Sequence, residues 1–295
     1  MDLGRAGLWT TTLDGLPVPE AREAVAELDE LGYPALWFGE ARGREAFTAA
    51  QLYLGASSRM VVATGIASIY GRDAVAANAA GRTLTEAYPG RFLLGLGVSH
   101  APLVERMRGH SYGRPVTAMS EYLDAMDAAP YAVAGPDEPA PRVLAALGPR
   151  MLELSRDRAQ GAHPYLTLPQ HTAQAREILG PDALLAVEVS AVLSDDRETW
   201  LRRAHTHLEI YTGLENYRNS WSRQGFTDDD YVRGGSERLK EALVAHGDED
   251  AVVRRVQEHL DAGADHVCVQ VLGDDPLTAP RAQWRRLAPA LTALR

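Results

Sequence analysis

Short apolar runs alternate with longer amphipathic segments along the chain, and this alternation predicts strands and helices in turn. Eight runs have the length and composition of buried strands: Leu3–Thr10, Ala35–Phe38, Met60–Ile69, Arg91–Gly95, Arg142–Ala146, Gly161–Leu166, Leu184–Leu193 and His266–Leu272. Strands that alternate with helices form parallel sheets, and eight such units within 295 residues favour a closed barrel. The sequence therefore predicts an α/β fold, a TIM-like (β/α)8 barrel, in a single domain over residues 1–295.

The segments between these runs space their apolar residues as helices do. The predicted helices are Pro19–Leu31, Phe47–Ala56, Ala74–Ala87, Met119–Ala128, Pro149–Arg158, Gln170–Leu179, Asp195–Leu214, Ser236–Ala245, Asp250–Ala262 and Trp284–Leu294. His100–Pro115 and Tyr131–Pro141 are rich in turn-forming residues and are predicted as loops. Asn216–Arg233 is polar and aromatic, and it fits neither pattern.

One strand end and one helix start carry glycines that suit ligand binding. In a parallel barrel, the carboxyl ends of the strands form the face where catalytic residues gather. Gly95 and Gly97 at such an end let backbone N–H groups approach a ring or a phosphate closely. Gly148-Pro149-Arg150 opens a predicted helix, where free N–H groups, the helix dipole and the arginine favour an anion.

Composition narrows the possible partners. The formal net charge is −10, Lys240 is the only lysine and there is no basic tract, which argues against nucleic-acid binding. There is no apolar run of membrane-spanning length and no signal-peptide pattern, so we expect a soluble cytoplasmic protein without membrane partners. Cys268 is the only cysteine, and we expect it to be buried in the last strand.

Other catalytic signatures are missing from the sequence. It contains no Walker loop, no complete Gly-x-Gly-x-x-Gly fingerprint and no Gly-x-Ser-x-Gly elbow. No group of His, Cys, Asp and Glu has the spacing of a zinc site, so no metal is predicted. His205, His207 and Tyr211 share one predicted helix with Trp200, and burial or solvation explains them better than a metal does.

Several segments, in their order and spacing, resemble a known family. They are ALWFGEA (Ala35–Ala41), VVATGIASIYGRDA (Val61–Ala74), GRFLLGLGVSH (Gly90–His100), VLAALGPRM (Val143–Met151) and HLDAGADHVCVQV (His259–Val271). The chain resembles the luciferase-like monooxygenase superfamily, in particular its branch of coenzyme F420-dependent oxidoreductases. This resemblance implies a luciferase-like (β/α)8 barrel with insertions, a homodimer, and F420 or FMN bound at the carboxyl-terminal mouth.

The resemblance also assigns residues to the cofactor. It implies a non-proline cis peptide in a bulge at Gly65-Ile66, against which the cofactor ring leans, with Ser68 and Tyr70 at the mouth. The main chain of Gly97, Val98 and Ser99 would contact the ring. The segment Ala146, Leu147, Gly148, Pro149 and Arg150 would hold the phosphate-bearing tail, while His163, Pro164 and Tyr165 would shape the pocket.

Two residues are predicted as catalytic. His100 stands where some relatives carry a glutamate near the reacting carbon, and a histidine there can exchange a proton near neutral pH. Glu40 stands where relatives carry an acid that bonds to the deazaflavin or the substrate, but Ala41 replaces the histidine that often follows it. His110 and Tyr112 belong to the loop after the fourth strand, a position from which they can cover substrate.

Together these features predict an oxidoreductase that transfers a hydride between F420 and a small organic substrate. An FMN-dependent monooxygenase of the same superfamily is the first alternative. A non-catalytic barrel that binds a flavin or another ligand is the second. Arg72 and Arg150 near the mouth favour F420, because its tail is longer and more acidic than that of FMN.

Overall fold

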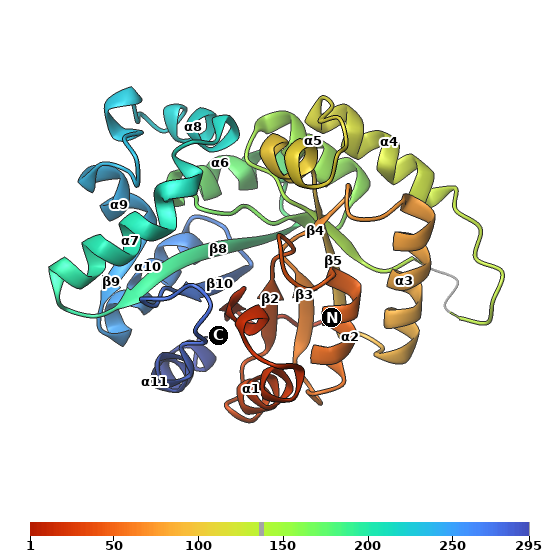
Figure 1. Cartoon of the computed structure of the whole chain (residues 1–295), viewed down its shortest axis with the longest axis horizontal. Coiled ribbons are helices and arrows are strands. Elements are labelled where there is room, and N and C mark those ends of the chain that lie inside the picture. Colours follow the sequence, from red (N-terminus) through yellow and green to blue (C-terminus); the bar gives the residue numbers. More distant parts are fainter. Residues whose placement is uncertain (136–138, 295) are drawn as a thin grey trace.

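A computed structural model describes residues 1–135 and 139–294 and shows a closed barrel of parallel strands (Figure 1). The barrel strands are β1 (Ala6–Trp9), β2 (Ala35–Phe38), β3 (Val61–Thr64) continued by β4 (Ala67–Ser68), β5 (Phe92–Gly97), β6 (Arg142–Leu144), β7 (Gly161–Ala162), β8 (Leu184–Leu193) and β10 (His266–Val271). Strand β10 pairs with both β8 and β1, and this closes the barrel. The predicted fold is confirmed.

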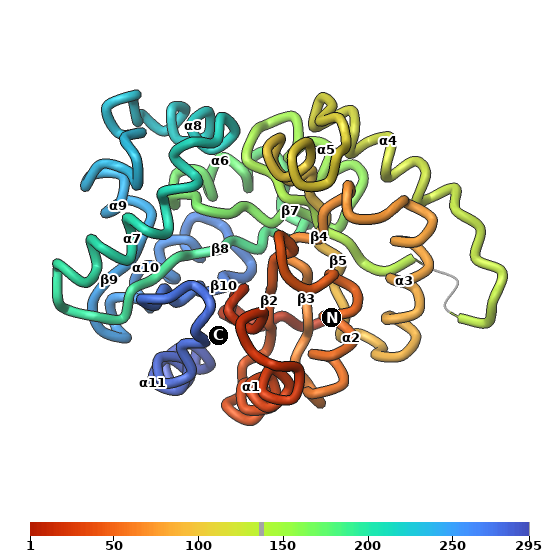
Figure 2. The backbone as a smooth tube through the Cα atoms, viewed as in Figure 1, coloured from red at the N-terminus to blue at the C-terminus, as the bar shows by residue number. Residues whose placement is uncertain are grey.

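Helices surround the barrel, and a smaller lobe lies at the far end of β8 (Figure 2). The surrounding helices are α1 (Val18–Glu30), α2 (Ala46–Leu54), α3 (Ala74–Ala87), α4 (Pro115–Asp127), α5 (Pro149–Arg158), α6 (Pro169–Leu179), α10 (Glu249–Asp261) and α11 (Arg281–Thr292). The lobe contains α7 (Arg197–Tyr211), α8 (Glu215–Ser222), α9 (Glu237–Leu243) and the short strand β9 (Val244–Gly247). Its core is a separate apolar cluster around Trp200, Leu208 and Trp221.

The structure corrects the sequence-based assignment in three segments. The helix predicted over Ser236–Ala245 ends at Leu243, because the next residues pair as β9 with the long strand β8. The loop predicted over His100–Pro115 contains a π-helical turn, Pro102–Met107. The unassigned segment Asn216–Arg233 contains most of α8 and a 3-10 turn at Asp228–Asp230. Part of the loop predicted over Tyr131–Pro141, residues 136–138, lies outside the described residues.

Side chains along each strand alternate between the barrel interior and the helix layer, as the two-residue period of a strand requires. In β8, Ala186 faces the interior beside Trp37 and Cys268, whereas Val187 and Val189 pack in the apolar layer beneath the helices. Cys268 is buried, as predicted. The same alternation turns the side chains of Glu188 and Ser190 toward the interior side of β8, where both are buried.

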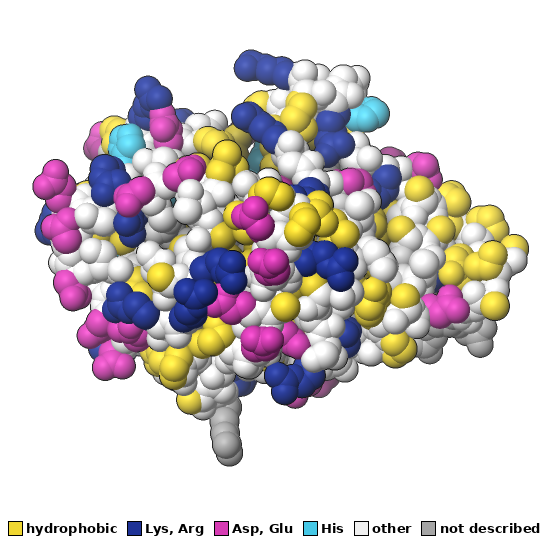
Figure 3. Space-filling view, turned by 60° about the horizontal axis from the view of Figure 1, so that its bottom comes forward, with side chains coloured by type: hydrophobic (Ala, Val, Ile, Leu, Met, Phe, Trp, Pro, Cys, Tyr) yellow, Lys and Arg dark blue, Asp and Glu magenta, His cyan; other side chains and the backbone are white. Residues whose placement is uncertain are grey.

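Charged side chains of both signs cover the surface. On the face in Figure 3, acidic and basic side chains lie interspersed. Surface arginines pair with carboxylates, for example Arg286 with Glu249 at 2.7 Å and Arg158 with Asp124 at 2.7 Å. Such exposed pairs contribute little to stability. Within the described part of the chain, no helix is both long and apolar enough to cross a membrane.

Several histidines are buried in the neutral state. In His266, Nδ1 donates to the Gly4 carbonyl at 2.9 Å, and Nε2 accepts from the Trp37 indole at 3.1 Å. A proton on Nε2 would face the indole N–H, which is itself a donor. Burial lowers the pKa of His163 and His266 to about 4 and that of His259 to about 3.

We therefore expect the free energy of unfolding to fall as the pH is lowered from 6.5 toward about 4. In this interval the unfolded chain binds protons at these histidines while the folded chain does not, so stability decreases by about 1.4 kcal/mol per pH unit for each histidine. Urea denaturation across the interval measures the effect. Buried carboxylates with a lowered pKa, such as Asp29, lose their contribution only near and below their unfolded value of 3.8. A flat profile between pH 6.5 and 4 would contradict the prediction.

Candidate active site at the carboxyl-terminal mouth

The barrel wall is interrupted where β3 passes into β4. The bond between Gly65 and Ile66 is a non-proline cis peptide, as predicted for this position. Two main-chain hydrogen bonds tie the interruption to the end of β2: the Gly65 N–H donates to the Phe38 carbonyl at 2.7 Å, and the Glu40 N–H donates to the Ile66 carbonyl at 3.1 Å. The four residues from Thr64 to Ala67 thus form a backbone ledge at the mouth.

On the side of the ledge that faces β5, the Thr64 side chain takes the place of a backbone partner for Gly95. Its hydroxyl donates to the Gly95 carbonyl at 2.7 Å and accepts from the Gly95 N–H at 2.8 Å. A Cβ atom on Gly95 would lie 1.9 Å from the Thr64 carbonyl oxygen, and one on Gly97 would lie 2.5 Å from the Ile66 side chain. The two glycines at the end of β5 therefore make room for the ledge.

Trp9 and His163 support the ledge from inside the barrel. The Trp9 indole donates to the Gly65 carbonyl at 3.0 Å. The His163 ring stacks on Trp37 at a centroid distance of 4.4 Å, and its Nδ1 donates to the Ala186 carbonyl at 2.9 Å. Its buried Nε2 has no hydrogen-bond partner among the described residues, and a Cβ on Gly65 would lie 2.8 Å from it. Only a glycine fits at this point of the ledge.

Glu40 is bound to the ledge rather than free. Its Oε2 accepts from the Ser68 N–H at 2.8 Å, and its Oε1 accepts from the Ala46 N–H at 3.3 Å and from Arg72. Arg72 also pairs with Glu45 at 2.8 Å. The charge of Arg72 is thereby neutralised, so Arg72 does not supply the free arginine expected for an acidic tail. A catalytic role of Glu40 stays a prediction.

Val98, Ser99 and His100 form the accessible rim after β5, where each is partly exposed. Ser99 has a φ of 57°, and its carbonyl accepts from the Tyr112 hydroxyl at 3.2 Å. The His100 ring lies 5.7 Å from the Tyr217 ring. Burial lowers the pKa of His100, against a smaller raising effect of the Asn216 side chain, so the imidazole is neutral at pH 7. The loop residue His110 packs beside Tyr70, at 6.2 Å between ring centroids.

The start of α5 lies open to solvent, as the anion site requires. Gly148 is partly exposed, and Pro149 and Arg150 are exposed, whereas Ala146 is buried. The Leu147 carbonyl accepts from Arg223 at 2.8 Å. Sequence analysis missed Arg223, because it lies in the segment that fitted no pattern. Within the described residues, neither Arg150 nor Arg223 has a carboxylate partner.

The remaining predicted residues differ in their accessibility. Ser68 and Pro164 are buried, so their side chains do not line an open surface. Ile66 and Tyr165 are partly exposed. The Tyr165 ring lies 5.1 Å from that of Trp9 and joins an aromatic group with Tyr211 and Tyr217. The structure thus brings Gly65, Ile66, Tyr165 and the rim after β5 to one mouth.

Sequence analysis also passed over a polar group inside the barrel. Glu188 and Ser190 lie in the Val-rich strand β8, and His207 was interpreted only as a buried or solvated helix residue. A single carboxyl among apolar strand residues is the signal that points to this group, because an isolated buried charge is costly. In the described residues, no cluster of three or more His, Cys, Asp and Glu can hold a metal ion.

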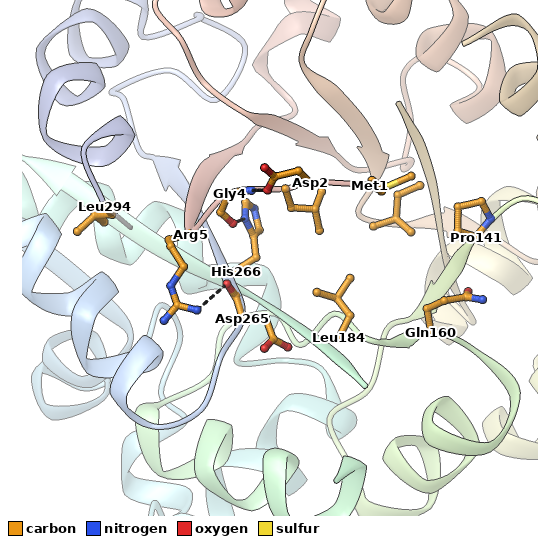
Figure 4. Close-up of a pocket in the computed structure, with 12 residues that line it drawn as sticks. Met1, Asp2, Gly4, Arg5, Pro141, Gln160, Leu184, Asp265, His266 and Leu294 are labelled. Atoms are coloured by element: carbon orange, nitrogen blue, oxygen red, sulfur yellow. Dashed lines mark hydrogen bonds between the residues drawn. The ribbon is translucent and has the colours of Figure 1, made fainter. Parts of the chain in front are cut away.

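A cavity of about 580 Å³ opens at the opposite end of the barrel (Figure 4). Its lining includes Gly4, Leu184, Asp265 and His266, which lie at or just before the starts of strands. Its polar groups are largely occupied by the chain, since Arg5 donates to the Asp265 carbonyl and both His266 nitrogens are bonded. Catalytic residues of such barrels lie at the carboxyl ends of strands, so we place the candidate site at the other mouth.

Comparison with known proteins identifies the family of the chain. The family described as luciferase-like monooxygenase matches residues 3–266, and the chain belongs to this family. It is therefore an oxidoreductase.

Individual relatives share only a small part of their sequence with this chain. A Mycobacterium tuberculosis protein with the provisional name coenzyme F420-dependent oxidoreductase is 30% identical over 108 residues, which are 37% of this chain and 31% of that protein. An F420-dependent secondary alcohol dehydrogenase superposes with a TM-score of 0.73 at 13% identity over 100% of both chains.

Two further solved structures share the fold. The coenzyme F420-dependent tetrahydromethanopterin reductase of Methanopyrus kandleri has a TM-score of 0.71 at 15% identity, with 99% of this chain and 98% of that chain covered. An FMN-bound Baeyer-Villiger monooxygenase component of Pseudomonas putida has a TM-score of 0.71 at 12% identity, with 99% and 97% covered. At these identities the likeness shows the fold alone.

We expect Thr64→Val to lower the free energy of unfolding by about 1–3 kcal/mol, because it leaves the buried N–H of Gly95 without its partner and removes one hydrogen bond from the Gly95 carbonyl, which still pairs with β4. Valine keeps the shape of threonine, so the loss reports the two hydrogen bonds. Urea denaturation measures it. Thr83→Val on the exposed side of α3, where the hydroxyl bonds only to the Ala79 carbonyl, is the control and should change stability by less than about 0.5 kcal/mol. Equal effects of the two variants would contradict this role of Thr64.

Proposed function

We propose that the protein is an F420-dependent oxidoreductase that transfers a hydride between the deazaflavin and a small organic substrate. The observation that carries this proposal is the pair of arginines at the start of α5. Arg223 binds the Leu147 carbonyl just before α5, and Arg150 is the second residue of this helix. Neither has a carboxylate partner among the described residues, and the helix dipole adds to their positive charge. A longer, more acidic tail gains more from this site than the single phosphate of FMN does.

The mouth also fits the flat ring of such a cofactor. The ledge at Gly65-Ile66 offers backbone and the Ile66 side chain, and the unpaired Nε2 of His163 lies directly behind it. Gly97, Val98 and Ser99 would contact the ring, while Gly148, Pro149, Arg150 and Arg223 would hold the tail. When bound, the deazaflavin accepts or donates a hydride, which is chemistry that no side chain supplies.

His100 is the proposed proton-exchanging group at the rim. Because its imidazole is neutral at pH 7, it can accept a proton from a substrate hydroxyl or donate its ring N–H in a hydrogen bond. Glu40 holds the ledge through the Ser68 N–H and Arg72, so we assign it a positioning role in this mechanism. Tyr112 bonds to the Ser99 carbonyl and thereby covers one side of the rim.

An FMN-dependent monooxygenase is the second candidate, favoured by the family description and by the FMN-bound neighbour from Pseudomonas putida. A barrel that binds a flavin without turnover is the third. The homodimer, the single domain over residues 1–295 and the cytoplasmic location stay predictions from the sequence.

Direct titration of the purified protein with F420 and with FMN tests the cofactor. We expect tighter binding of F420, and we expect Arg223→Ala to weaken F420 binding about tenfold, because a charge-assisted hydrogen bond contributes about 1.5–3 kcal/mol. The effect on FMN should be smaller. Arg22→Ala, an exposed change on α1, is the control and should leave both affinities unchanged. Tighter binding of FMN would overturn the choice of F420.

His100→Ala should lower kcat about 100-fold or more while cofactor affinity stays the same, since loss of a general acid–base group has effects of this size. The measurement is steady-state turnover with the cofactor that binds and a substrate found by screening alcohols and carbonyl compounds. His205→Ala, which changes an exposed histidine of α7, is the matched control. Unchanged turnover would remove His100 from the mechanism, and a wild-type protein without turnover in the whole screen would favour the non-catalytic barrel.

A further inference from the structure

One carboxyl group lies inside the barrel wall without a cation beside it. Glu188 is fully buried on the inner face of β8, and its neighbour across the strand pair is Cys268 of β10. Its Oε2 accepts from the Leu166 N–H at 3.0 Å, and its Oε1 is bonded to the Ser190 hydroxyl at 2.7 Å. No ion pair involves Glu188 within the described residues. A buried carboxyl group without a neighbouring cation is more stable in its protonated, neutral form than as a carboxylate.

The backbone of the segment that follows β7 is shaped around this carboxyl. Leu166 has a φ of 53°, a left-handed conformation that residues other than glycine rarely adopt. In this conformation the Leu166 N–H points to Glu188, and the Leu166 carbonyl accepts from the Trp221 indole at 3.0 Å. Non-glycine residues in such conformations gather at functional sites. The geometry of Leu166 therefore marks Glu188 as more than a packing residue.

A hydrogen-bonded chain leads from Glu188 toward the mouth. The Ser190 hydroxyl lies 3.1 Å from Nε2 of His207 on α7. The other ring nitrogen, Nδ1, has no partner among the described residues and is not enclosed, and the ring lies beside those of Tyr165 and Tyr211. A hydroxyl can donate and accept at once, so a proton on Glu188 can be passed through Ser190 to His207 and returned.

The other titratable groups around Glu188 stay neutral near pH 7. Tyr165, Tyr211 and Tyr217 face it from the β7 end, α7 and α8, and Cys268 faces it from β10. Burial raises the pKa of all four. It also raises the pKa of Glu188 to about 7, against the opposing effect of the Ser190 and Leu166 hydrogen bonds. Burial lowers the pKa of His207, so the resting proton of the chain belongs to Glu188.

We propose that Glu188, Ser190 and His207 form a proton relay that serves the hydride transfer at the mouth. This inference rests on the proposed function. When a hydride with its electron pair adds to a substrate double bond, the substrate gains one negative charge. The relay neutralises it: the Glu188 proton moves to Ser190 Oγ, the Ser190 proton moves to His207 Nε2, and a proton of His207 moves to the substrate. In this step His100 takes the second of its two roles and donates a hydrogen bond to the substrate. In the oxidative direction each proton moves back, and Glu188 ends protonated.

Infrared difference spectroscopy of the cofactor-free protein tests the proton site directly. We expect the carbonyl stretching band of a protonated carboxyl to disappear as the pH is raised, with a midpoint of about 7. The band should be absent in Glu188→Gln. In Ser190→Ala its midpoint should move upward, because the ionised carboxylate loses a hydrogen bond that favours the charged form. Ser220→Ala is the matched control and should leave the band unchanged, because Ser220 is a buried serine of α8 whose hydroxyl has no hydrogen-bond partner in the part of the chain that the structure describes.

The rate of turnover tests the relay, and it is measured with whichever cofactor, F420 or FMN, the protein binds. We expect Glu188→Gln to lower kcat about 100-fold with KM and cofactor affinity unchanged, and to remove the pH step near 7 from the rate profile. Ser190→Ala should lower kcat in the same way, so the test does not depend on one variant folding.

Different experimental outcomes contradict the proposed function and the proton relay. A wild-type protein that binds neither cofactor overturns the proposed function, and with it the coupling of the relay to hydride transfer. A protein that binds and turns over while Glu188→Gln keeps the wild-type rate and pH step overturns the relay alone. Absence of the titrating band from the wild-type protein overturns Glu188 as the proton site.

Discussion

The interruption of the barrel wall between β3 and β4 is the constraint on which the mouth depends. Backbone groups that leave a strand ladder inside a protein need other partners, because unpaired buried amides are costly. Here the Thr64 hydroxyl bonds to both backbone groups of Gly95, the Trp9 indole bonds to the Gly65 carbonyl, and the Glu40 carboxylate bonds to the Ser68 N–H. Each partner comes from a different strand end, so the ledge exists only in the closed barrel.

The low dielectric of the interior decides which protonation states the site can use. Burial keeps His163 and His266 neutral, and it keeps a proton on Glu188 up to about pH 7. The proposed hydride transfer would need one proton for each hydride, and a neutral carboxyl can store that proton without a buried charge. The ion pair of Glu40 with Arg72 lies at the mouth instead, as does Arg223, which has no carboxylate partner within residues 1–135 and 139–294. Charged groups there can meet a charged ligand.

The lobe beyond the barrel completes the site from one side. Strand β8 extends past the barrel, and its pairing with β9 gives α7 and α8 a surface to pack on. These helices place His207 beside Ser190, Tyr217 beside His100 and Arg223 beside Leu147. The barrel therefore supplies the ledge and the buried carboxyl, while the lobe supplies side chains that face them across the mouth.

Local patterns in the sequence determined the eight barrel strands and most helices, because the burial of alternating side chains leaves a signal in neighbouring residues. The position of the ledge was implied by the resemblance to a known family. The sequence did not indicate β9, the pairing of Glu40 with Arg72, or the grouping of Glu188 with Ser190 and His207. Strand pairing and partner choice depend on residues far apart in the chain. The four residues of β9 follow α9 directly, and their sequence alone does not distinguish them from the end of that helix. Only their pairing with β8 makes them a strand. A carboxyl in a Val-rich strand becomes a proton site only when the closed barrel removes water from it and another helix brings an imidazole within reach.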